Sequence, residues 1–454
     1  MTAVLDIADR ALRHLGREGQ VTVIHERSLT ARFSRSAPTQ ATDVDDTTIH
    51  LLSVEEGHTG AATVNSVDET ELSEAGARAR EAARAARLAG PGDYPGLPEP
   101  AGMRQHTGYD PTTAALDPVQ AGTALEATFA AAAEHGLEAF GIWSAGEVRT
   151  AIASTHGVRT EDALTDAYMR VICRDGEGRA GFASDASVTS RKLDGPALAH
   201  RAAAKVTSEP PATLPPGEYT VVLEPEAVGT LLEFLGGLAF NGLAHAEGRG
   251  ALVGRIGQPV ATPQVNLADS PRNPCTLPRS FDCEGVPKAP IPLIQDGIAF
   301  RVTHDRRSAA RAGEDPSAST GHALAPGGSP GGPRPTNLVL AGGGAEDEQE
   351  LVAGVERGLY VTRLWYVNSV HDQRTLLTGV TREGTFLIEN GEITRPLGDL
   401  RFTDSVLRLL AHTDELTRHQ HLVCAGDFYG RRFATGVVCP ALRAHGFRIT
   451  GAAA

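Results

Sequence analysis

Two segments in the first half of the chain match each other at a constant spacing, and this internal repeat constrains the fold more than any other feature. The segment that begins at Thr59 aligns with the segment that begins at Ala180, an offset of 121 residues. Residues of the same kind recur at paired positions: Gly60 with Gly181, Ala62 with Ala183, Ser66 with Ser187, Leu72 with Leu193 and Arg80 with Arg201. The repeat therefore predicts two structurally related units.

Each unit contains the pattern of a helix, several strands and a second helix rich in Ala and Arg. Apolar residues spaced by three and four positions indicate helices, whereas alternating or β-branched residues indicate strands. The first unit predicts helices at 4–15 and 71–87 with strands such as 21–26 and 47–54, and the second predicts helices at 123–135 and 196–206 with strands at 138–144, 148–155 and 167–174.

Two proline-rich stretches indicate where the chain divides. Residues 90–100 separate the two copies, and residues 208–219 separate the first half from the second. The predicted units are an N-terminal α+β domain at 1–212, with copies at about 1–89 and 101–207, and a C-terminal domain at 213–454.

The second half has the pattern of a mostly β domain. One long helical run, 227–245, is followed by short strands between Gly, Pro and Asx turns, such as the strand at 297–304. Few further helices are expected, including 346–357 and 404–412. Asn390-Gly391 between two apolar runs predicts a type I′ hairpin, because both residues accept positive φ angles at little cost. The predicted fold class is α+β, a duplicated helix-strands-helix half followed by a mostly β domain.

Charge and hydropathy exclude two classes of partner. The formal net charge is -14 and no basic run with interleaved aromatic residues offsets it, so we expect no nucleic acid partner. No apolar stretch reaches the roughly 18 residues of a membrane span, and the first residues form an amphipathic pattern rather than a signal peptide. We therefore expect no membrane partner and a cytoplasmic location.

Residues 238–250 look like the edge of a metal site, because His245 stands two residues before Glu247. A zinc peptidase needs two or three His or carboxylate ligands on one rigid face and a carboxylate that activates water. A single histidine cannot supply this set, and a half-buried histidine at a helix end is the competing interpretation. Cys439 is either a thiolate ligand or a buried structural cysteine. The five cysteines include no Cys-x-x-Cys pair, which argues against a zinc ribbon and a disulfide framework.

The stretch from Arg279, RSFDCEGVPKAPIPLIQDGIAFRVTHDRRSAARAG, resembles the corresponding part of the TldD/PmbA family, the modulators of gyrase, which are bacterial metallopeptidases. Further motifs follow in the order found in that family: STGHA from Ser319, PTNLVLAGG from Pro335, GLYVTRLW from Gly358, TGVTREGTFLIENGEI from Thr378 and CPALRAHGFRITG from Cys439. RFSRSAPTQ at Arg32 extends the resemblance into the first half.

The family contains two kinds of subunit, which pair as heterodimers. The TldD-like kind carries His-Glu-x-x-x-His on a helix and a later cysteine as zinc ligands, and the TldE/PmbA-like kind lacks that motif. When this sequence is aligned on His245, Ala246 stands at the position of the glutamate and Gly250 at that of the second histidine. The resemblance therefore implies the TldE/PmbA type, with no catalytic residue and no metal ligand in this chain and with zinc in a TldD-like partner.

The resemblance thus implies a non-catalytic, peptide-binding subunit of a heterodimeric zinc metalloprotease, without a cofactor of its own and inactive alone. Its substrates would be unfolded proteins or precursors of modified peptides that lose a leader. His245, Glu247 and Cys439 are the candidate cavity or peptide-binding residues, because they match the region that holds zinc in the partner type. Two alternatives stay open: an independent hydrolase with a divergent metal site built from these residues, and a homodimeric binding scaffold without protease activity.

Overall fold

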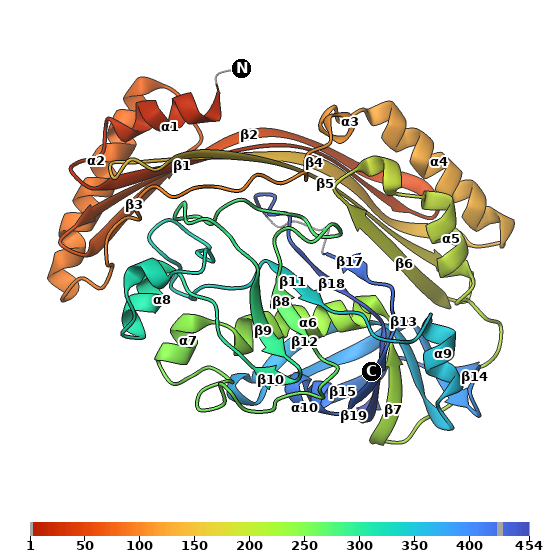
Figure 1. The fold of residues 1–454 in the computed structure, drawn as a ribbon. Coiled ribbons are helices and arrows are strands. Elements are labelled where there is room, and N and C mark those ends of the chain that lie inside the picture. Colours follow the sequence, from red (N-terminus) through yellow and green to blue (C-terminus); the bar gives the residue numbers. More distant parts are fainter. Residues whose placement is uncertain (1–2, 425–429, 454) are drawn as a thin grey trace.

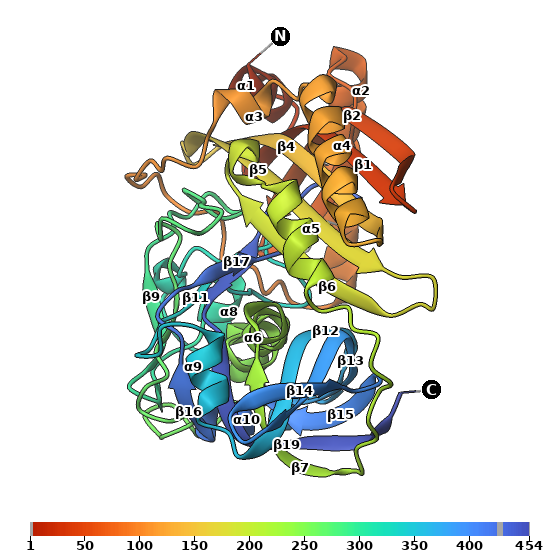
Figure 2. The ribbon, with the colours of Figure 1, turned by 90° about the vertical axis from the view of Figure 1, so that its right-hand side faces the viewer.

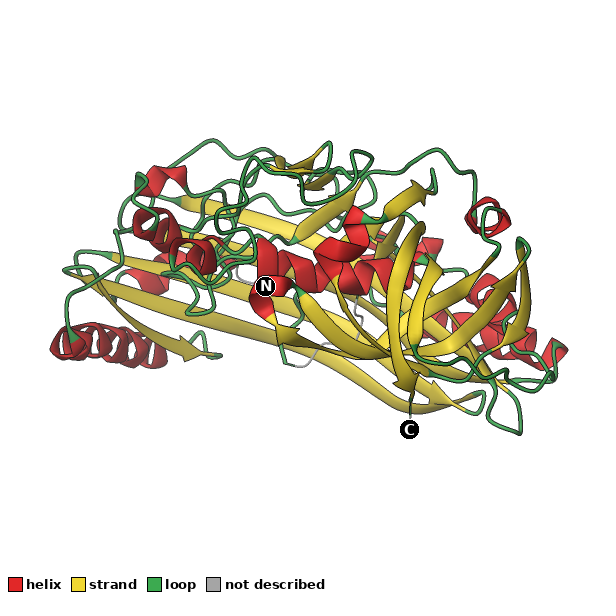
Figure 3. Ribbon diagram, turned by 90° about the horizontal axis from the view of Figure 1, so that it is seen from below, coloured by secondary structure: helices red, strands yellow, loops and turns green. Residues whose placement is uncertain are grey.

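The first half of the protein forms one long antiparallel sheet. In the computed structural model, which describes residues 3–424 and 430–453, its six strands lie in the order β3-β2-β1-β4-β5-β6. They are β1 (Gly19–Ser34), β2 (Ala37–Glu55), β3 (His58–Val64), β4 (Glu138–Ser154), β5 (Arg159–Arg174) and β6 (Ala180–Ser187). This arched sheet curves over the rest of the molecule (Figure 1) and its strands run across most of the molecule's width (Figure 3).

Helices cover the outer face of the arched sheet (Figure 1). They are α1 (Val4–Leu12), α2 (Glu69–Ala86), α3 (Pro111–Ala114), α4 (Pro118–Glu134) and α5 (Gly195–Ala203). Side chains alternate along β1, so that Val21 and Val23 pack with the helices while Thr22, Ile24 and Glu26 point to the inner face. One side of the strand is apolar and the other is largely polar. Both sides are buried, because both faces of the sheet are covered.

The two halves of the arched sheet repeat one unit. Each contains a helix, three antiparallel strands and a second helix, and the copies meet where β1 pairs with β4. The paired glycines occupy equivalent places, since a Cβ on Gly60 would collide with the α2 backbone at Ala79 and one on Gly181 with the α5 backbone at Ala202. Only glycine lets each edge strand approach its helix so closely. The predicted duplication is confirmed.

The second half contains a closed barrel. Strands β12, β7, β19, β15 and β13 pair in that order, and β13 pairs back onto β12. The bounds of these strands and of two that attach to them are β7 (Gly217–Leu223), β12 (Arg357–His371), β13 (Leu376–Glu389), β14 (Glu392–Pro396), β15 (Leu400–Ser405), β16 (Thr413–Leu416) and β19 (Leu442–Ala452). Closure of the ring satisfies the backbone hydrogen bonds of its strands without a free edge.

A second six-stranded sheet shares one apolar core with the barrel and with helix α6 (Pro225–Ala239). Its strands, in the order β10-β9-β8-β11-β18-β17, are β8 (Leu267–Asp269), β9 (Ile291–Gln295), β10 (Ile298–Ala299), β11 (Asn337–Leu340), β17 (His421–Val423) and β18 (Gly436–Cys439). Helix α6 lies between this sheet and the barrel, below the arched sheet (Figure 2). Packing of the second sheet and the barrel on α6 therefore places this helix below the inner face of the arched sheet.

Short elements complete the fold. They are α7 (Gly242–Ala246), α8 (Arg306–Arg311), α9 (Glu348–Ala353), α10 (Val406–Ala411) and four 3-10 turns, η1 (Arg87–Ala89), η2 (Ser190–Lys192), η3 (Pro316–Ala318) and η4 (Asp372–Arg374). Among the described residues, none of the helices combines the length and apolar character that a membrane crossing requires.

The α+β fold class is confirmed, and the second half differs from the expectation in two details. The helical run 227–245 is interrupted, because α6 ends at Ala239 with Phe240 as its C-cap. Asn241 then caps α7 by accepting a hydrogen bond from the amide of Ala244 at 3.1 Å. The strand expected at 297–304 is reduced to the two residues of β10. Asn390 and Gly391 have φ angles of 54° and 80°, as a type I′ hairpin requires. The division of the chain at residue 212 stays a prediction.

One buried side chain, Arg432, anchors the second half to the arched sheet. Its guanidinium donates to both carboxylate oxygens of Asp166 on β5, at 2.7 and 2.6 Å, and to Ser144 Oγ on β4 at 3.0 Å. Its backbone amide donates to Glu26 on β1 at 2.7 Å. Arg432 is only 2% exposed, and Gly146 leaves room for it, since a Cβ there would collide with the guanidinium.

We predict that Arg432→Met destabilises the protein by about 3–5 kcal/mol, because it leaves the carboxylate of Asp166 buried without its partner. The measurement is the free energy of unfolding in urea. The matched control is Arg418→Met, which breaks an exposed pair with Glu346 and should change stability by less than about 1 kcal/mol. Equal effects of the two substitutions would contradict the anchoring role.

Candidate functional site

A cavity of about 700 Å³ lies between the arched sheet and the second half of the molecule. Its walls come from β5 and β6 on one side and from α6, β11, β12, β17 and β18 on the other. This volume falls in the range of roughly 300–1,000 Å³ that is usual for ligand-binding clefts. The cavity is therefore the first candidate for a binding site.

Helix α6 presents one polar face to this cavity. Glu226, Gly229, Thr230 and Glu233 all line it, and their spacing of three, four and seven residues places them on one side of a helix. The opposite side of α6, including Leu231 and Leu235, packs in the shared apolar core. The polar face carries two carboxylates and a hydroxyl, and no histidine.

The two carboxylates differ in their partners. Glu226 accepts a short hydrogen bond from the Ser184 hydroxyl on β6. Glu233 makes no hydrogen bond or ion pair with another described residue, although Arg334 is close enough to favour its charged form. Burial raises the pKa of both carboxyls above the ordinary value. Both groups can therefore accept further hydrogen bonds from a ligand.

The barrel contributes a cation and an aromatic ring to the cavity wall. Arg363 donates to Glu383 through Nε at 2.6 Å. Its guanidinium also lies over the rings of Phe182 and Trp365, with distances of 4.5 and 4.9 Å to the ring centroids. Arg382 also lies over the Trp365 ring, 5.7 Å from its centroid. Trp365 is 40% exposed, so part of the indole stays accessible in the cavity wall.

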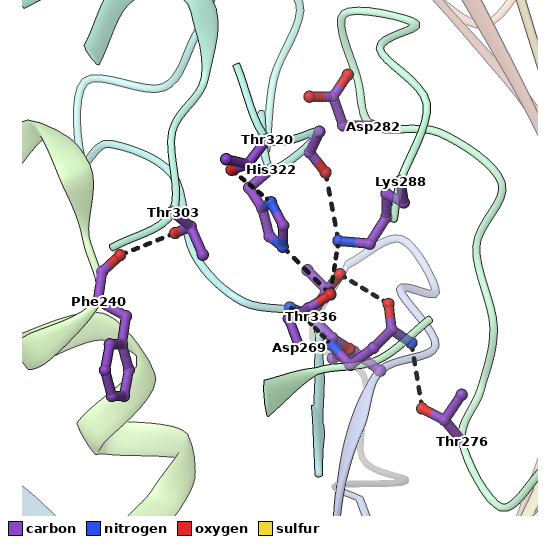
Figure 4. Close-up of polar contacts among 12 residues, drawn as sticks. Phe240, Asp269, Thr276, Asp282, Lys288, Thr303, Thr320, His322 and Thr336 are labelled. Atoms are coloured by element: carbon purple, nitrogen blue, oxygen red, sulfur yellow. Dashed lines mark hydrogen bonds and ion pairs between the residues drawn. The ribbon is translucent and has the colours of Figure 1, made fainter. Parts of the chain in front are cut away.

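A smaller cavity of about 50 Å³ adjoins the large one, and the two share Leu324, Thr336 and Phe433 in their walls. Lys288 and His322 form part of the smaller cavity. Lys288 Nζ and His322 Nε2 each lie 3.2 Å from Oδ1 of Asp269, and Figure 4 shows both side chains pointing at this carboxylate.

The carboxylate of Asp269 holds several loops together. Its Oδ2 accepts hydrogen bonds from the backbone amides of Thr336 and Asn337, both at 2.8 Å. Burial opposes ionisation of Asp269, but Lys288, His322 and these amides outweigh it, so the pKa of Asp269 is well below its ordinary value. Burial lowers the pKa of His322, which favours a neutral ring. The arrangement is a buried ion pair that fixes loops distant in sequence.

A second acidic pair, Asp282 and Glu284, lies next to this network. Asp282 accepts hydrogen bonds from the amides of Glu284, Val286 and Ala323 at 2.9–3.0 Å. Burial, together with repulsion from Asp282, raises the pKa of Glu284 to about 8, and burial raises that of Asp282 to about 6. Glu284 is fully buried, so the protein holds a carboxyl that is protonated near neutral pH.

The sequence-predicted residues His245 and Glu247 lie outside the large cavity. His245 is on α7, half-buried, with no hydrogen-bond partner on Nδ1, and burial lowers its pKa. Glu247 pairs with Arg249 and lines a separate cavity of about 400 Å³. The match of Ala246 and Gly250 to a zinc motif assumed a continuous helix, but α7 ends at Ala246. Helix α6, not α7, faces the large cavity.

Cys439 is also separated from His245. Its thiol, fully buried on β18, donates to the carbonyl of Pro225, the first residue of α6, at 3.4 Å. His245 lies beyond the opposite end of α6, which has 15 residues and is therefore about 22 Å long. The structure does not bring Cys439 together with His245 and Glu247. Their assignment to a peptide-binding cavity stays a prediction.

Within residues 3–424 and 430–453, no three His, Cys, Asp or Glu side chains are arranged to hold a metal ion. The residues that sequence reasoning missed are Glu226, Glu233 and Trp365. A signal for the first two was present, because they stand seven residues apart in an otherwise apolar helical run. Trp365 carries no comparable signal, since an aromatic residue in a strand is usually part of a core.

Comparison with known proteins identifies the family. A model of the PmbA/TldA metallopeptidase C-terminal domain matches residues 216–451, more than half of the chain. The chain belongs to this family. The matched region contains α6, the barrel and the second sheet, and thus most of the walls of the large cavity.

Curated relatives named as metalloproteases align with part of the chain. A metalloprotease of Methanothermobacter thermautotrophicus is 26% identical over 200 residues, 44% of this chain and 43% of that protein. A metalloprotease of Synechocystis is 27% identical over 214 residues, 46% of this chain and 43% of that protein. The aligned part thus spans less than half the length of each of these relatives.

Two solved structures share the fold over nearly the whole chain. TldE from Thermococcus kodakarensis superimposes with a TM-score of 0.84 at 21% identity, over 98% of this chain and 99% of that chain. A candidate modulator of a DNA gyrase from Thermotoga maritima superimposes with a TM-score of 0.82 at 19% identity, over the same shares. The fold of these two structures therefore matches that of this chain through the arched sheet as well.

We predict that Cys275 alone reacts quickly with an aromatic disulfide reagent at neutral pH, because it is the exposed cysteine. Burial raises the pKa of Cys173 and of Cys283 to about 11, and raises those of Cys424 and Cys439 well above the ordinary value. Thiolates, which react, are thus scarce at these sites. Rapid labelling of a Cys275→Ser variant in the folded state would contradict this.

Glu284 predicts a dependence of stability on pH. Its folded-state pKa of about 8 exceeds the ordinary 4.5, so its contribution is complete below pH 4.5 and is lost as the pH rises through about 8. The glutamine of Glu284→Gln stays neutral at every pH. The difference between the urea midpoint of this variant and that of the unmodified protein should therefore shift in favour of the variant between about pH 5 and about pH 8. The exposed control Glu392→Gln should show a constant difference. A constant difference for Glu284→Gln as well would disprove the assignment.

Proposed function

We propose that this chain is a non-catalytic, peptide-binding subunit of a zinc metalloprotease, and that a TldD-like partner supplies the zinc. Its substrates would be unfolded proteins or precursors of modified peptides from which a leader is removed. The proposal includes assembly as a heterodimer and a cytoplasmic location. It rests on membership of the family and on the chemistry of the large cavity.

One observation carries the proposal. The face of α6 that lines the cavity bears Glu226, Thr230 and Glu233, whereas a catalytic zinc site of a peptidase is built from histidines with a carboxylate on a rigid element. The residues on this face can accept hydrogen bonds and bind cations. They do not form the ligand set that would activate a zinc-bound water.

The cavity also has the composition of a peptide-binding site. Its walls combine apolar side chains, including Leu338, Leu364 and Val437, with polar groups and the partly exposed Trp365. Apolar walls with a few polar groups that fix orientation are typical of sites for small ligands and peptide segments. The alternative of an independent hydrolase would need Cys439 near His245, and α6 separates them.

We predict that the chain purified alone contains far less than one zinc ion per molecule and cleaves no unfolded protein. Addition of a TldD-like partner should give zinc-dependent proteolysis in a stable one-to-one complex. Metal content by mass spectrometry, complex mass by light scattering and cleavage of an unfolded substrate test these points. The control is the same complex with a zinc-ligand histidine of the partner replaced by alanine, which should be inactive.

Three results would reject the proposal. About one zinc ion per isolated chain, lost in His245→Ala, would support the independent hydrolase. Proteolysis by the chain alone would have the same meaning. A homodimer that persists in the presence of the partner would favour the binding scaffold.

A further inference from the structure

Some charged side chains in the wall of the large cavity have partners within the protein, and others do not. Arg363 pairs with Glu383, and Arg431 donates to Nε2 of His50 at 2.8 Å. Arg170, a third cation in the wall, also has an interaction partner. A fourth cation of the wall, Arg334, lies close enough to Glu233 to favour its charged form but makes no hydrogen bond or ion pair with a described residue.

The carboxylates of α6 retain capacity for a ligand. Glu233 is exposed to the cavity and has no hydrogen bond or ion pair with a described residue. Arg334 influences its ionisation but forms no ion pair with it in the described structure. Glu226 accepts one hydrogen bond, from Ser184, although a carboxylate offers about four acceptor positions. Both carboxylates therefore retain acceptor positions that a positively charged donor of a ligand can fill.

The surroundings of Glu233 favour a particular kind of cation. Leu338, Leu364, Val423 and the indole of Trp365 line the same cavity as Glu233 and give it apolar wall surface. Glu226 and Glu233 are two helical turns apart, about 10 Å along the axis, which equals about three residues of an extended chain. A peptide can therefore lie along this face with aliphatic groups on the wall and a charged nitrogen at the carboxylate.

We propose that the cavity binds a primary ammonium group of an extended peptide, at the carboxylate of Glu233, with Glu226 as a second acceptor two turns away. The ammonium belongs either to the peptide's amino terminus or to a lysine side chain. This inference rests on the proposed function, which makes the ligand a peptide. It adds that the ligand carries a positive charge. A bound cation would also favour ionised carboxyls whose pKa values burial raises.

The chain offers its own reporter for the test. It contains two tryptophans, of which Trp143 is 3% exposed in the core of the arched sheet while Trp365 lines the cavity. In a Trp143→Phe background, fluorescence therefore reports Trp365 alone. Titration of this full-length chain with peptides gives dissociation constants for the cavity.

Four short apolar peptides with amidated carboxyl termini separate the sources of charge. The first has a free amino terminus. The others are acetylated and carry lysine, norleucine or glutamate at the central position. A peptide with an ammonium should bind at least about tenfold more tightly than the norleucine peptide, and the glutamate peptide should bind most weakly. The first two peptides show which ammonium the cavity prefers.

Substitution of the carboxylate tests the location. Glu233→Gln should reduce the preference for an ammonium to less than about threefold while the norleucine peptide binds unchanged. Glu392→Gln, an exposed residue on β14 away from the cavity, is the matched control and should retain the full preference. Equal urea midpoints of the variants exclude misfolding as the cause.

Four outcomes would overturn the inference: equal binding of the ammonium and norleucine peptides, tighter binding of the glutamate peptide, an undiminished preference in Glu233→Gln, or no binding to the chain or to its complex with the partner. Its failure is distinguishable from that of the proposed function. Partner-dependent proteolysis without ammonium preference rejects only this inference. Ammonium preference without any activating partner rejects only the proposed function.

Discussion

The buried contact between Arg432 and Asp166 is the interaction on which the arrangement of the two halves depends. Removing both charges from water is costly, and the paired hydrogen bonds of a guanidinium with a carboxylate offset that cost only in a fixed geometry. Ser144 and Glu26 add contacts from two further strands. One residue thus ties the second half to three strands of the arch, β1, β4 and β5.

Much of the fold could be predicted because it follows from local periodicity. The repeat at an offset of 121 residues became two copies of one unit within a single sheet, and Gly60 and Gly181 explain why glycine recurs at this spacing. The Asn390-Gly391 hairpin was predictable because the conformation of a two-residue turn depends on those residues alone. The resemblance to the metallopeptidase family rested on motifs that the family match, 216–451, overlaps.

The site could not be predicted in the same way, because its contacts join residues that no period relates. The Asp269 network combines Lys288, His322 and backbone amides from separate loops. His245 is close to Glu247 in sequence, but α6 ends at Ala239 and His245 lies on the separate helix α7, outside the large cavity. In the sequence, Glu233 has the pattern of a polar position on an amphipathic helix. Its place in the cavity depends on the arched sheet on the opposite side, which no local pattern predicts.

The junction of β1 and β4 has a consequence for how this architecture can arise. Fourteen residue pairs join the two copies, from Gln20 with Ser154 to Phe33 with Gly141. A single copy on its own would expose this entire strand edge, and an exposed edge is satisfied most readily by a second molecule of the same kind. The arched sheet is equivalent to a symmetric dimer of one unit fused into a single chain. Fusion makes the interface independent of protein concentration and allows the inner faces of the two copies to diverge, so that only the second copy, through β5 and β6, lines the large cavity in the described part of the chain.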